Sequence, residues 1–306
     1  MKYAQIFSRL QAKNYLSCMR SLLLLICCIA SLGKADAQKT DKKLEREIQN
    51  LVSGFHGSVG IYVHDLKHNH IAAINADTIF PTASIVKIPI LLGIMQKISA
   101  GELDYHQRLT YTSNLFYDEG DDILSRFKDS ATIELSKVMM LMLTISDNCA
   151  SLWLQQLAGG GARINQLLDS LGCSITRVNS RTAGREANRA QYGWGQSSPQ
   201  EIAALMEKIV KGEIFSRETS AKMLRLLGRQ YWDEQALSAI PAGIFAADKN
   251  GAVDGSRNEV VYVNGPKHPY IFSIFTKNNQ DRSWEKNNEA WVMTRKLSTF
   301  LWEYFE

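Results

Sequence analysis

The sequence predicts an α+β fold, with one antiparallel sheet built from strands at both ends of the chain and an all-helical lobe inserted between them. Runs typical of strands occur near the N-terminus, at 58–63 and 70–75, and return near the C-terminus, at 244–252, 259–263 and 270–276. Between these two groups, apolar residues recur at helical spacing. We therefore expect the terminal strands to pair with one another and helices to flank the sheet.

The predicted helices combine an apolar stripe with a recognisable start or stop. Asp41 can cap the first helix, which carries Leu44 and Ile48 on one face. Ser198, directly before a proline, is a favourable start for another. The predicted helices span 41–54, 84–98, 132–143, 148–157, 162–171, 198–210, 216–227 and 288–305. Residues 174–197 have no clear period, which predicts a long surface loop of the kind that is usually functional.

Residues 1–37 have the pattern of a secretory signal peptide. Basic residues precede the apolar run 22–30, and residues 35–37 read Ala-Asp-Ala, a small-x-small cleavage pattern. The apolar run is shorter than the roughly 20 residues needed to cross a bilayer. Both Met1 and Met19 are compatible with this signal as translation starts. We therefore expect a periplasmic or secreted protein without a stable membrane anchor.

Removal of this segment leaves one predicted domain, 38–306, long enough for a large core. Its α/β lobe would comprise about 38–80 and 230–306, and its helical lobe about 81–229. Five of the 35 basic residues and one of the 31 acidic residues lie in the signal, so 30 of each remain. Without a basic excess we expect no nucleic-acid partner, and we expect a monomer.

The first motif with chemical meaning is Ser84 with Lys87. They lie three positions apart at the start of a predicted helix, so they share one face. A serine hydroxyl becomes a useful nucleophile when a neighbouring base takes its proton. A lysine desolvated by an apolar helix has a lowered pKa and can act as that base. The pair alone is a weak signal, because most such serines and lysines are surface residues.

Two further motifs can complete such a site. The Ser-Asp-Asn motif at 146–148 falls between two predicted helices, where a turn can direct a hydroxyl and an amide toward a substrate. Taken alone, it is typical of a helix cap. The Lys-Asn-Gly motif at 249–251 ends a predicted strand and offers a positive charge beside a glycine that permits close approach. Taken alone, it is a strand end with a solvated lysine.

Together the three motifs resemble the S-x-x-K, S-D-N and K-T-G set of class A β-lactamases and penicillin-binding proteins. The spacing agrees, with 62 positions from Ser84 to Ser146 and 103 from Ser146 to Lys249. The resemblance extends over essentially the whole mature chain. It implies a serine hydrolase that opens a β-lactam ring through an acyl-enzyme, on a small β-lactam or peptide-like substrate, without a metal or organic cofactor.

The resemblance also implies a role for each catalytic residue. Ser84 attacks the lactam carbonyl, and Lys87 takes its proton. Ser146 relays a proton to the ring nitrogen. The backbone N–H groups of Ser84 and Ala252 form the oxyanion hole that stabilises the tetrahedral intermediate.

Four residues are assigned to substrate binding on the same grounds. Asn148 positions the acylamide side chain of the substrate, and Gly251 lets the substrate lie against the strand edge. Lys249 supplies a positive charge for the substrate carboxylate. Arg257, in a segment that resembles the family's arginine-bearing strand, holds the same carboxylate with its planar guanidinium.

Three features depart from the family's pattern. In its β-lactamases a loop glutamate activates the water for deacylation, but an ungapped alignment places Thr182 there. Glu186 lies four residues later and would share that face of a helical turn, so it is the predicted base. The loop's Arg–Asp brace is replaced by Ser180 and Gly195. Asn250 stands where the family has Thr or Ser.

These departures leave three functions open. The first is a β-lactamase. The second is a serine hydrolase or peptidase that acts on cell-wall peptides or on other amides or esters. The third is a penicillin-binding or sensor protein that is acylated without turnover. Glu186 discriminates among them, because a Glu186 that reaches a water beside Ser84 favours the first, and one that faces solvent favours the others.

The remaining polar residues receive simpler interpretations. The three histidines between 64 and 70 invite a metal site, but no carboxylate or cysteine cluster completes it, so a polar hairpin is expected. The acids at 118–122 are interpreted as a solvated loop, and Glu201 and Glu207 as surface acids. The cysteines of the mature chain are Cys149 and Cys173. The sequence leaves open whether they form a disulfide or remain buried thiols.

Overall fold

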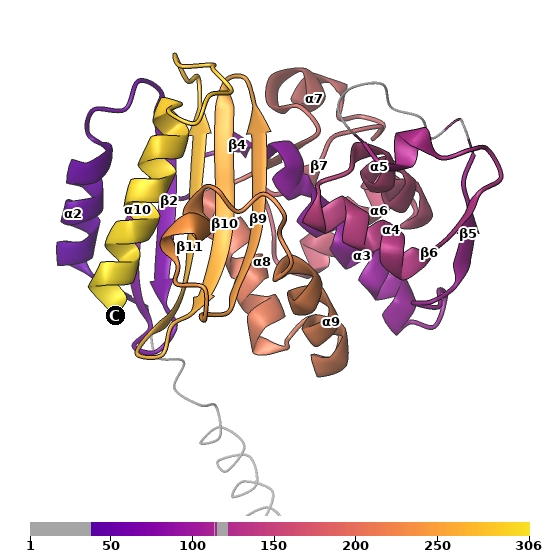
Figure 1. Cartoon of the computed structure of the whole chain (residues 1–306), viewed down its shortest axis with the longest axis horizontal. Helices are drawn as coiled ribbons and strands as arrows, with labels where there is room; N and C mark the ends of the chain where they lie inside the picture. The colour runs from indigo at the N-terminus through magenta and orange to yellow at the C-terminus, as the bar shows by residue number, and fades with distance from the viewer. Residues whose placement is uncertain (1–37, 113, 115–121) are drawn as a thin grey trace, which may run out of the picture. The chain divides into compact units, whose positions relative to one another are not determined.

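A six-stranded sheet has helices on both of its faces (Figure 1). Its order is β1-β3-β2-β11-β10-β9, and all neighbours are antiparallel except the short β1, which pairs parallel with β3. The strands are β1 (Lys39–Thr40), β2 (Ser58–Asp65), β3 (His70–Ile74), β9 (Ala246–Val253), β10 (Ser256–Asn264) and β11 (Pro269–Lys277). Because β2 pairs with β11, the prediction that both ends of the chain share one sheet is confirmed. The computed structural model describes residues 38–112, 114 and 122–306, so the predicted signal peptide lies outside the described residues.

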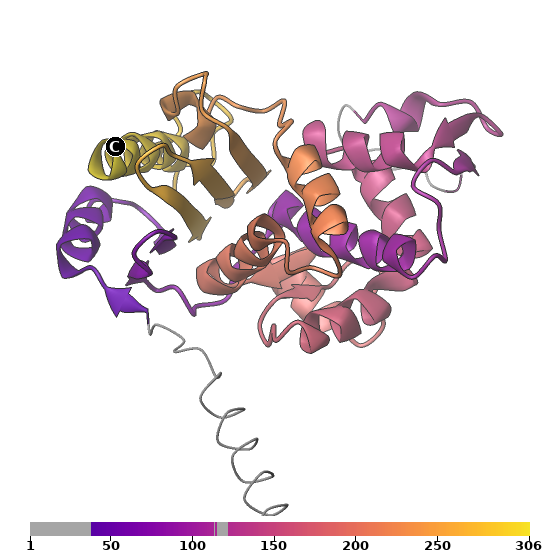
Figure 2. The same cartoon turned by 90° about the horizontal axis from the view of Figure 1, so that it is seen from below.

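Two helices cover one face of the sheet and a third covers the other. Helices α2 (Lys42–Val52) and α10 (Glu289–Phe305) pack their apolar residues against one face. Helix α8 (Pro199–Lys211) packs on the opposite face, and Figure 2 shows the two layers on either side of the sheet. Asp41 caps α2 by accepting hydrogen bonds from the next turn, as the sequence predicts.

The segment between the two halves of the sheet is mainly helical. Its central helix, α3 (Lys87–Ser99), follows a 3-10 turn, η1 (Ala83–Val86), and is buried from Lys87 to Met95. A helix that is apolar on every side belongs inside a core. The helices α4 (Leu135–Thr144), α5 (Asn148–Leu157), α6 (Gly160–Ser170) and α9 (Arg217–Leu227) pack around it.

The inserted segment also contains short strands, so it is not all-helical. Contrary to the helix expected from residue 132, β6 (Thr132–Glu134) pairs with β5 (Arg108–Thr110). The expected loop at 174–197 is partly ordered into regular elements, which are too short to show a period in the sequence. These are β7 (Arg177–Val178), α7 (Glu186–Tyr192) and β8 (Gly195–Ser197), and β8 also pairs with β4 (Phe80–Pro81). Two further 3-10 turns are η3 (Leu124–Arg126) and η4 (Ala236–Ala239).

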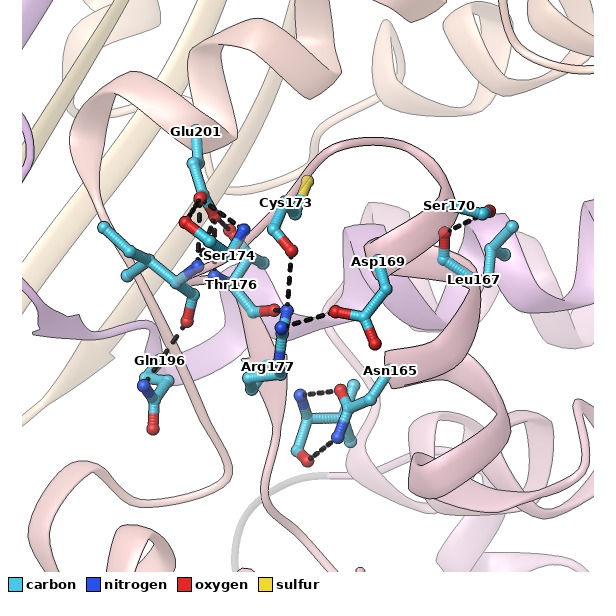
Figure 3. A network of polar contacts seen from close by, with 12 residues as sticks. Asn165, Leu167, Asp169, Ser170, Cys173, Ser174, Thr176, Arg177, Gln196 and Glu201 are labelled. Carbon is cyan, nitrogen blue, oxygen red and sulfur yellow. Dashed lines mark hydrogen bonds and ion pairs between the residues drawn. The ribbon is translucent and has the colours of Figure 1, made fainter.

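Side chains of α6 and α8 hold the 174–197 segment in place (Figure 3). The Glu201 carboxylate accepts hydrogen bonds from the three consecutive N–H groups of residues 174–176, at 2.7, 2.9 and 2.7 Å. Asn165 both donates to the Val178 carbonyl and accepts from the Val178 N–H, at 3.0 and 2.8 Å. Glu201 is therefore an anchor for this segment, and its interpretation as an ordinary surface acid is wrong.

The structure also answers the expectations for Glu207 and for the two cysteines. Glu207 accepts a hydrogen bond from the buried His64 at 2.9 Å, so it too has a structural partner. Cys149 and Cys173 are buried thiols and form no disulfide with each other. In the described part of the chain, we find no helix that is both long enough and apolar enough to cross a membrane.

Candidate active site

Ser84 lies within the 3-10 turn that leads into α3, and it is partly exposed. The turn is fixed from outside, because the Thr82 N–H donates to the Gly195 carbonyl at 3.0 Å. Ala83 has a φ of 45°, a left-handed conformation that costs free energy in a residue other than glycine. The surrounding structure therefore holds the predicted nucleophile in a strained but well-defined place.

The Lys87 side chain is fully buried, and its nitrogen is the centre of the site. Nζ lies 3.0 Å from the Ser84 Oγ and 3.0 Å from the Ser146 Oγ. It also donates to the Ser146 carbonyl at 2.5 Å and to the Asn148 Oδ1 at 2.9 Å. The structure thus brings four predicted site residues together around one nitrogen atom.

The hydrogen bonds around Lys87 suit a neutral amine. The Ser146 carbonyl and the Asn148 Oδ1 can only accept, so they use two N–H protons. The other two neighbours are hydroxyls, and a neutral amine has a lone pair that can accept a proton from one of them. Burial, and next the positive charge of Lys249, lower the pKa of Lys87 well below its usual value. The short distance to the Ser84 hydroxyl and the lowered pKa are the properties that a base toward Ser84 would need.

Ser146 sits in a strained turn held by two buried carboxylates. Its φ is 65°, again in the left-handed region. Asp147 caps α5, and Asp122 accepts a hydrogen bond from the Asn148 N–H at 2.7 Å. Asp122 is only 6% exposed and burial raises its pKa, so it does not belong to a solvated loop. Residues 118–121, the rest of that acidic stretch, lie outside the described residues.

Strand β9 brings Lys249 and Gly251 to the same site. Lys249 is fully buried, and its Nζ donates to the carbonyl and the Oδ1 of Asn250 at 2.9 and 3.1 Å. Burial lowers the pKa of Lys249 to about 8. A Cβ at position 251 would lie 2.6 Å from the Thr82 carbonyl oxygen and 2.7 Å from the Ser84 nitrogen. Gly251 is therefore required so that β9 can lie against the backbone of the nucleophile.

A buried acid pair beside Lys249 was missed by the sequence analysis. Asp248 and Glu259 are 1% and 2% exposed, and Glu259 accepts a hydrogen bond from the Ala236 N–H at 3.2 Å. Burial raises the pKa of Asp248 to about 7 and that of Glu259 well above its usual value. Both carboxyls favour the charged form of Lys249. The signal available in the sequence was that each of these acids lies within a strand that is otherwise mainly apolar or buried.

Arg257 does not have the place that the resemblance implies. In the β9–β10 register Arg257 is opposite Ala252 and Lys249 is opposite Val260, so Arg257 and Lys249 project from opposite faces of the sheet. The guanidinium lies 4.3 and 4.8 Å from the ring centres of Trp284 and Trp291 and donates to backbone carbonyls. The predicted role in carboxylate binding is therefore wrong, and Arg257 anchors the outer face of the sheet.

The 174–197 segment presents no carboxylate at the aligned position. Thr182 is 7% exposed, donates to the Ser180 carbonyl at 2.9 Å, and packs on Gly161, where an added Cβ would overlap its hydroxyl. Glu186 begins α7 and is exposed, and its Oε1 accepts a hydrogen bond from the Gly184 N–H at 3.1 Å. Its exposure matches the criterion for the functions other than a β-lactamase. Its role as a base stays a prediction.

Two groups of described residues hold three potential metal ligands within 4.8 Å of one another. They are Asp65, His68 and His268, and Asp122, Asp147 and Cys149. In the first group the Nδ1 atoms of His68 and His268 lie 2.9 and 3.1 Å from the Asp65 Oδ2. In the second group the two carboxylates accept backbone N–H groups. Hydrogen bonds within the protein account for the arrangement of these carboxylates and histidines.

An α+β fold that carries a serine, a buried lysine and a second serine around one nitrogen defines a protein of the serine β-lactamase type. Residues 43–305 match the Beta-lactamase enzyme family, and the chain belongs to that family. The match covers nearly all of the described residues, in agreement with the resemblance found from the motifs.

Solved structures with this fold include PBP-A and β-lactamases. PBP-A is 25% identical, with a TM-score of 0.77 over 88% of this chain and 97% of that one. A PBP-A mutant, also 25% identical, has been solved as an acyl-enzyme complex with penicillin G, with a TM-score of 0.77 over 88% of this chain and 98% of that one. A β-lactamase from Chitinophaga pinensis is 19% identical, with a TM-score of 0.78 over 87% and 100% of the two chains.

Proposed function

We propose that β-lactams acylate this protein on Ser84 and that it hydrolyses the acyl-enzyme slowly. The observation that carries the proposal is the position of the Lys87 Nζ, 3.0 Å from the hydroxyls of both Ser84 and Ser146. One buried amine can therefore exchange a proton with the nucleophile on one side and with the second hydroxyl on the other.

Acylation requires one bond to form, one bond to break and three proton transfers. Lys87 takes the Ser84 proton as Oγ bonds to the lactam carbonyl carbon. The backbone N–H groups of Ser84 and Ala252 stabilise the oxyanion. The carbon–nitrogen bond of the ring then breaks, and the ring nitrogen receives a proton from Ser146, which Lys87 restores. The enzyme groups thus end in their starting protonation states, with an ester on Ser84.

Substrate binding uses groups on both sides of this centre. The Oδ1 of Asn148 is bonded to Lys87, which leaves its amide NH₂ to donate to the acylamide carbonyl of the substrate. Lys249 attracts the substrate carboxylate, and the Asn250 side chain stands beside it. No role in substrate binding is proposed for Arg257, because its guanidinium is held between two indoles on the other face.

Deacylation is the slow step in this proposal. It needs a base beside a water molecule, and general-base help contributes roughly 10²–10⁴ in rate. The aligned position carries the buried Thr182, whose hydroxyl is bonded to a backbone carbonyl, and the nearby Glu186 faces solvent. The acyl-enzyme is therefore expected to persist.

The buried threonine at the aligned position and the exposed Glu186 also favour a second candidate function, acyl transfer or hydrolysis on cell-wall peptides. A peptide substrate can supply its own positioned amine as the acceptor, so a fixed base for water is not required. The predicted signal peptide would place the protein in the periplasm or outside the cell, where such peptides are found.

Intact-mass analysis after exposure to penicillin G tests the proposal. The mature protein should gain the mass of one whole penicillin, because ring opening adds the molecule without a leaving fragment. Ser84→Ala should gain nothing. Ser99→Ala, at the exposed end of α3, is the matched control and should be labelled like the wild type. Labelling that survives in Ser84→Ala, or a wild type that is never labelled, would refute the proposal.

A further inference from the structure

Two adjacent aromatic residues, Tyr231 and Trp232, have side chains that are open to solvent. They are 63% and 44% exposed, among the most exposed large apolar residues of the described chain. Their rings are 5.0 Å apart and nearly perpendicular, at 84°. Neither belongs to either apolar core of the described residues. Adjacent exposed aromatic residues are a feature of surfaces that bind a ligand or partner.

The pair is tied by hydrogen bonds to the residues just before the 146–148 motif and to Asn250 of the 249–251 motif. The Tyr231 N–H donates to the Thr144 carbonyl at 3.0 Å, and the Trp232 indole N–H donates to the Ile145 carbonyl at 3.0 Å. On the other side, the Asn250 Nδ2 donates to the Trp232 carbonyl at 3.1 Å. Ile145 directly precedes Ser146, and Asn250 directly follows Lys249.

These bonds link the pair to the residues directly before Ser146 and to the residue directly after Lys249. The indole uses its only donor on a backbone carbonyl, so the ring is held in one orientation, and 44% of the residue stays exposed. A rigid aromatic surface loses little conformational entropy when it binds a ligand. The pair therefore has the properties of a preformed contact surface.

We propose that Tyr231 and Trp232 bind an aromatic or other planar group on the leaving-group side of the substrate, next to its carboxylate. The inference rests on the proposed function, in which Ser146 protonates the leaving nitrogen and Lys249 attracts the carboxylate. In that proposal the leaving nitrogen lies at Ser146 and the carboxylate at Lys249, and Trp232 is hydrogen-bonded to the neighbours of both residues, Ile145 and Asn250. The acylamide side chain of the substrate would be bound by Asn148, so we expect this aromatic pair to have no effect on the preference for that side chain.

Two cephalosporins test the proposal. They differ only in the substituent on the ring carbon adjacent to the carbon that bears the carboxylate. One carries a methyl group there and the other a styryl group. The rate constant for acylation at low substrate concentration is measured for both, and the readout is their ratio. We expect the wild type to prefer the styryl compound, and Trp232→Ala to lower the ratio about 10-fold, the size expected for loss of one aromatic contact. Trp232→Phe keeps an aromatic face and should retain most of the preference.

Phe215→Ala is the matched control, because Phe215 is an exposed aromatic residue between α8 and α9. It should leave the ratio unchanged. A fall of equal size for both compounds in Trp232→Ala would indicate a purely structural role and overturn the inference, as would an unchanged pair of rates. If neither compound acylates the wild type, the proposed function itself fails and the inference fails with it. If both acylate without preference, only the inference fails.

Discussion

The surroundings of Ser84 and the 174–197 segment lie against one another, but their polar side chains make different kinds of contact. Around Ser84 the polar groups converge on a buried amine, and two residues hold left-handed backbone angles. In the 174–197 segment the polar groups instead satisfy backbone N–H and carbonyl groups, as Glu201 and Asn165 do. Under the proposed function, this difference means that the groups for forming an acyl-enzyme converge on Ser84, whereas the 174–197 segment presents no buried carboxylate at the aligned position for its hydrolysis.

The largest expected effect comes from removing the buried amine. Lys87→Met keeps the length and apolar stem of the side chain but supplies no base, so acylation by penicillin should slow by about 10³. Stopped-flow or quenched-flow mass analysis measures the rate, and the thermal midpoint checks folding. Lys97→Met, on the same helix but partly exposed, is the control and should acylate normally. A Lys87→Met protein that acylates within 3-fold of the wild type would exclude Lys87 as the base.

The second prediction sharpens the comparison by adding a carboxylate to the 174–197 segment. Thr182→Glu places a carboxylate at the position where the family's β-lactamases have theirs, so the acyl-enzyme should hydrolyse at least about 10-fold faster. Thr182→Gln has the same size without a base and serves as the control. The decay of the penicillin adduct gives both rates. Equal adduct lifetimes in the Glu and Gln variants would contradict the view that a carboxylate at this position is what the site lacks.

A third prediction concerns the pH dependence of acylation. The pKa of Lys87 is lowered, so its amine becomes protonated only as the pH falls through that lowered value, and the rate declines on the acid side. The pKa of Lys249 is about 8, so its charge is lost as the pH rises through about 8, and attraction for the substrate carboxylate declines on the alkaline side. The profile should be bell-shaped, with changes of up to about 10-fold per pH unit on each limb.

Lys249→Arg identifies the alkaline limb, because an arginine stays charged at these pH values. We expect this limb to move above pH 10 in the variant. An alkaline limb that stays near pH 8 would assign it to another group.

The smallest effect is expected from Glu186. Its side chain is exposed and bonded to the Gly184 N–H, so Glu186→Gln should change the lifetime of the penicillin adduct by less than about 2-fold. The time course of adduct loss measures it. A several-fold longer lifetime would restore Glu186 as the base and favour a β-lactamase.

Much of the fold and the Ser84–Lys87 pair of the site follow from local patterns in the sequence. Ser84 and Lys87 share a helical face at a spacing of three, and the alternating strands at both ends predicted the shared sheet. The motifs at 146–148 and 249–251 identified the remaining partners through their order and spacing. Each motif is set by a few neighbouring residues and can be found in one sequence, but the grouping of the three motifs into one site came from their resemblance to the family's set.

The failures have a different physical origin. The face on which Arg257 projects depends on the register of β10 against β9, which neither the local pattern nor the resemblance to the family's arginine-bearing strand reports. The burial of Asp122 and Glu259 depends on segments far away in the sequence, which no local pattern reports. The elements within 174–197 are two to seven residues long and are held by tertiary hydrogen bonds rather than by their own periodicity.

The central claim is that β-lactams acylate Ser84 faster than the resulting acyl-enzyme is hydrolysed. Mixing the mature protein with an excess of a chromogenic cephalosporin measures both steps in one trace. We expect a rapid burst of ring opening equal to one equivalent of protein, followed by a much slower linear phase while the adduct accumulates. A trace that is linear from the start, with no adduct detectable by mass, would contradict the account.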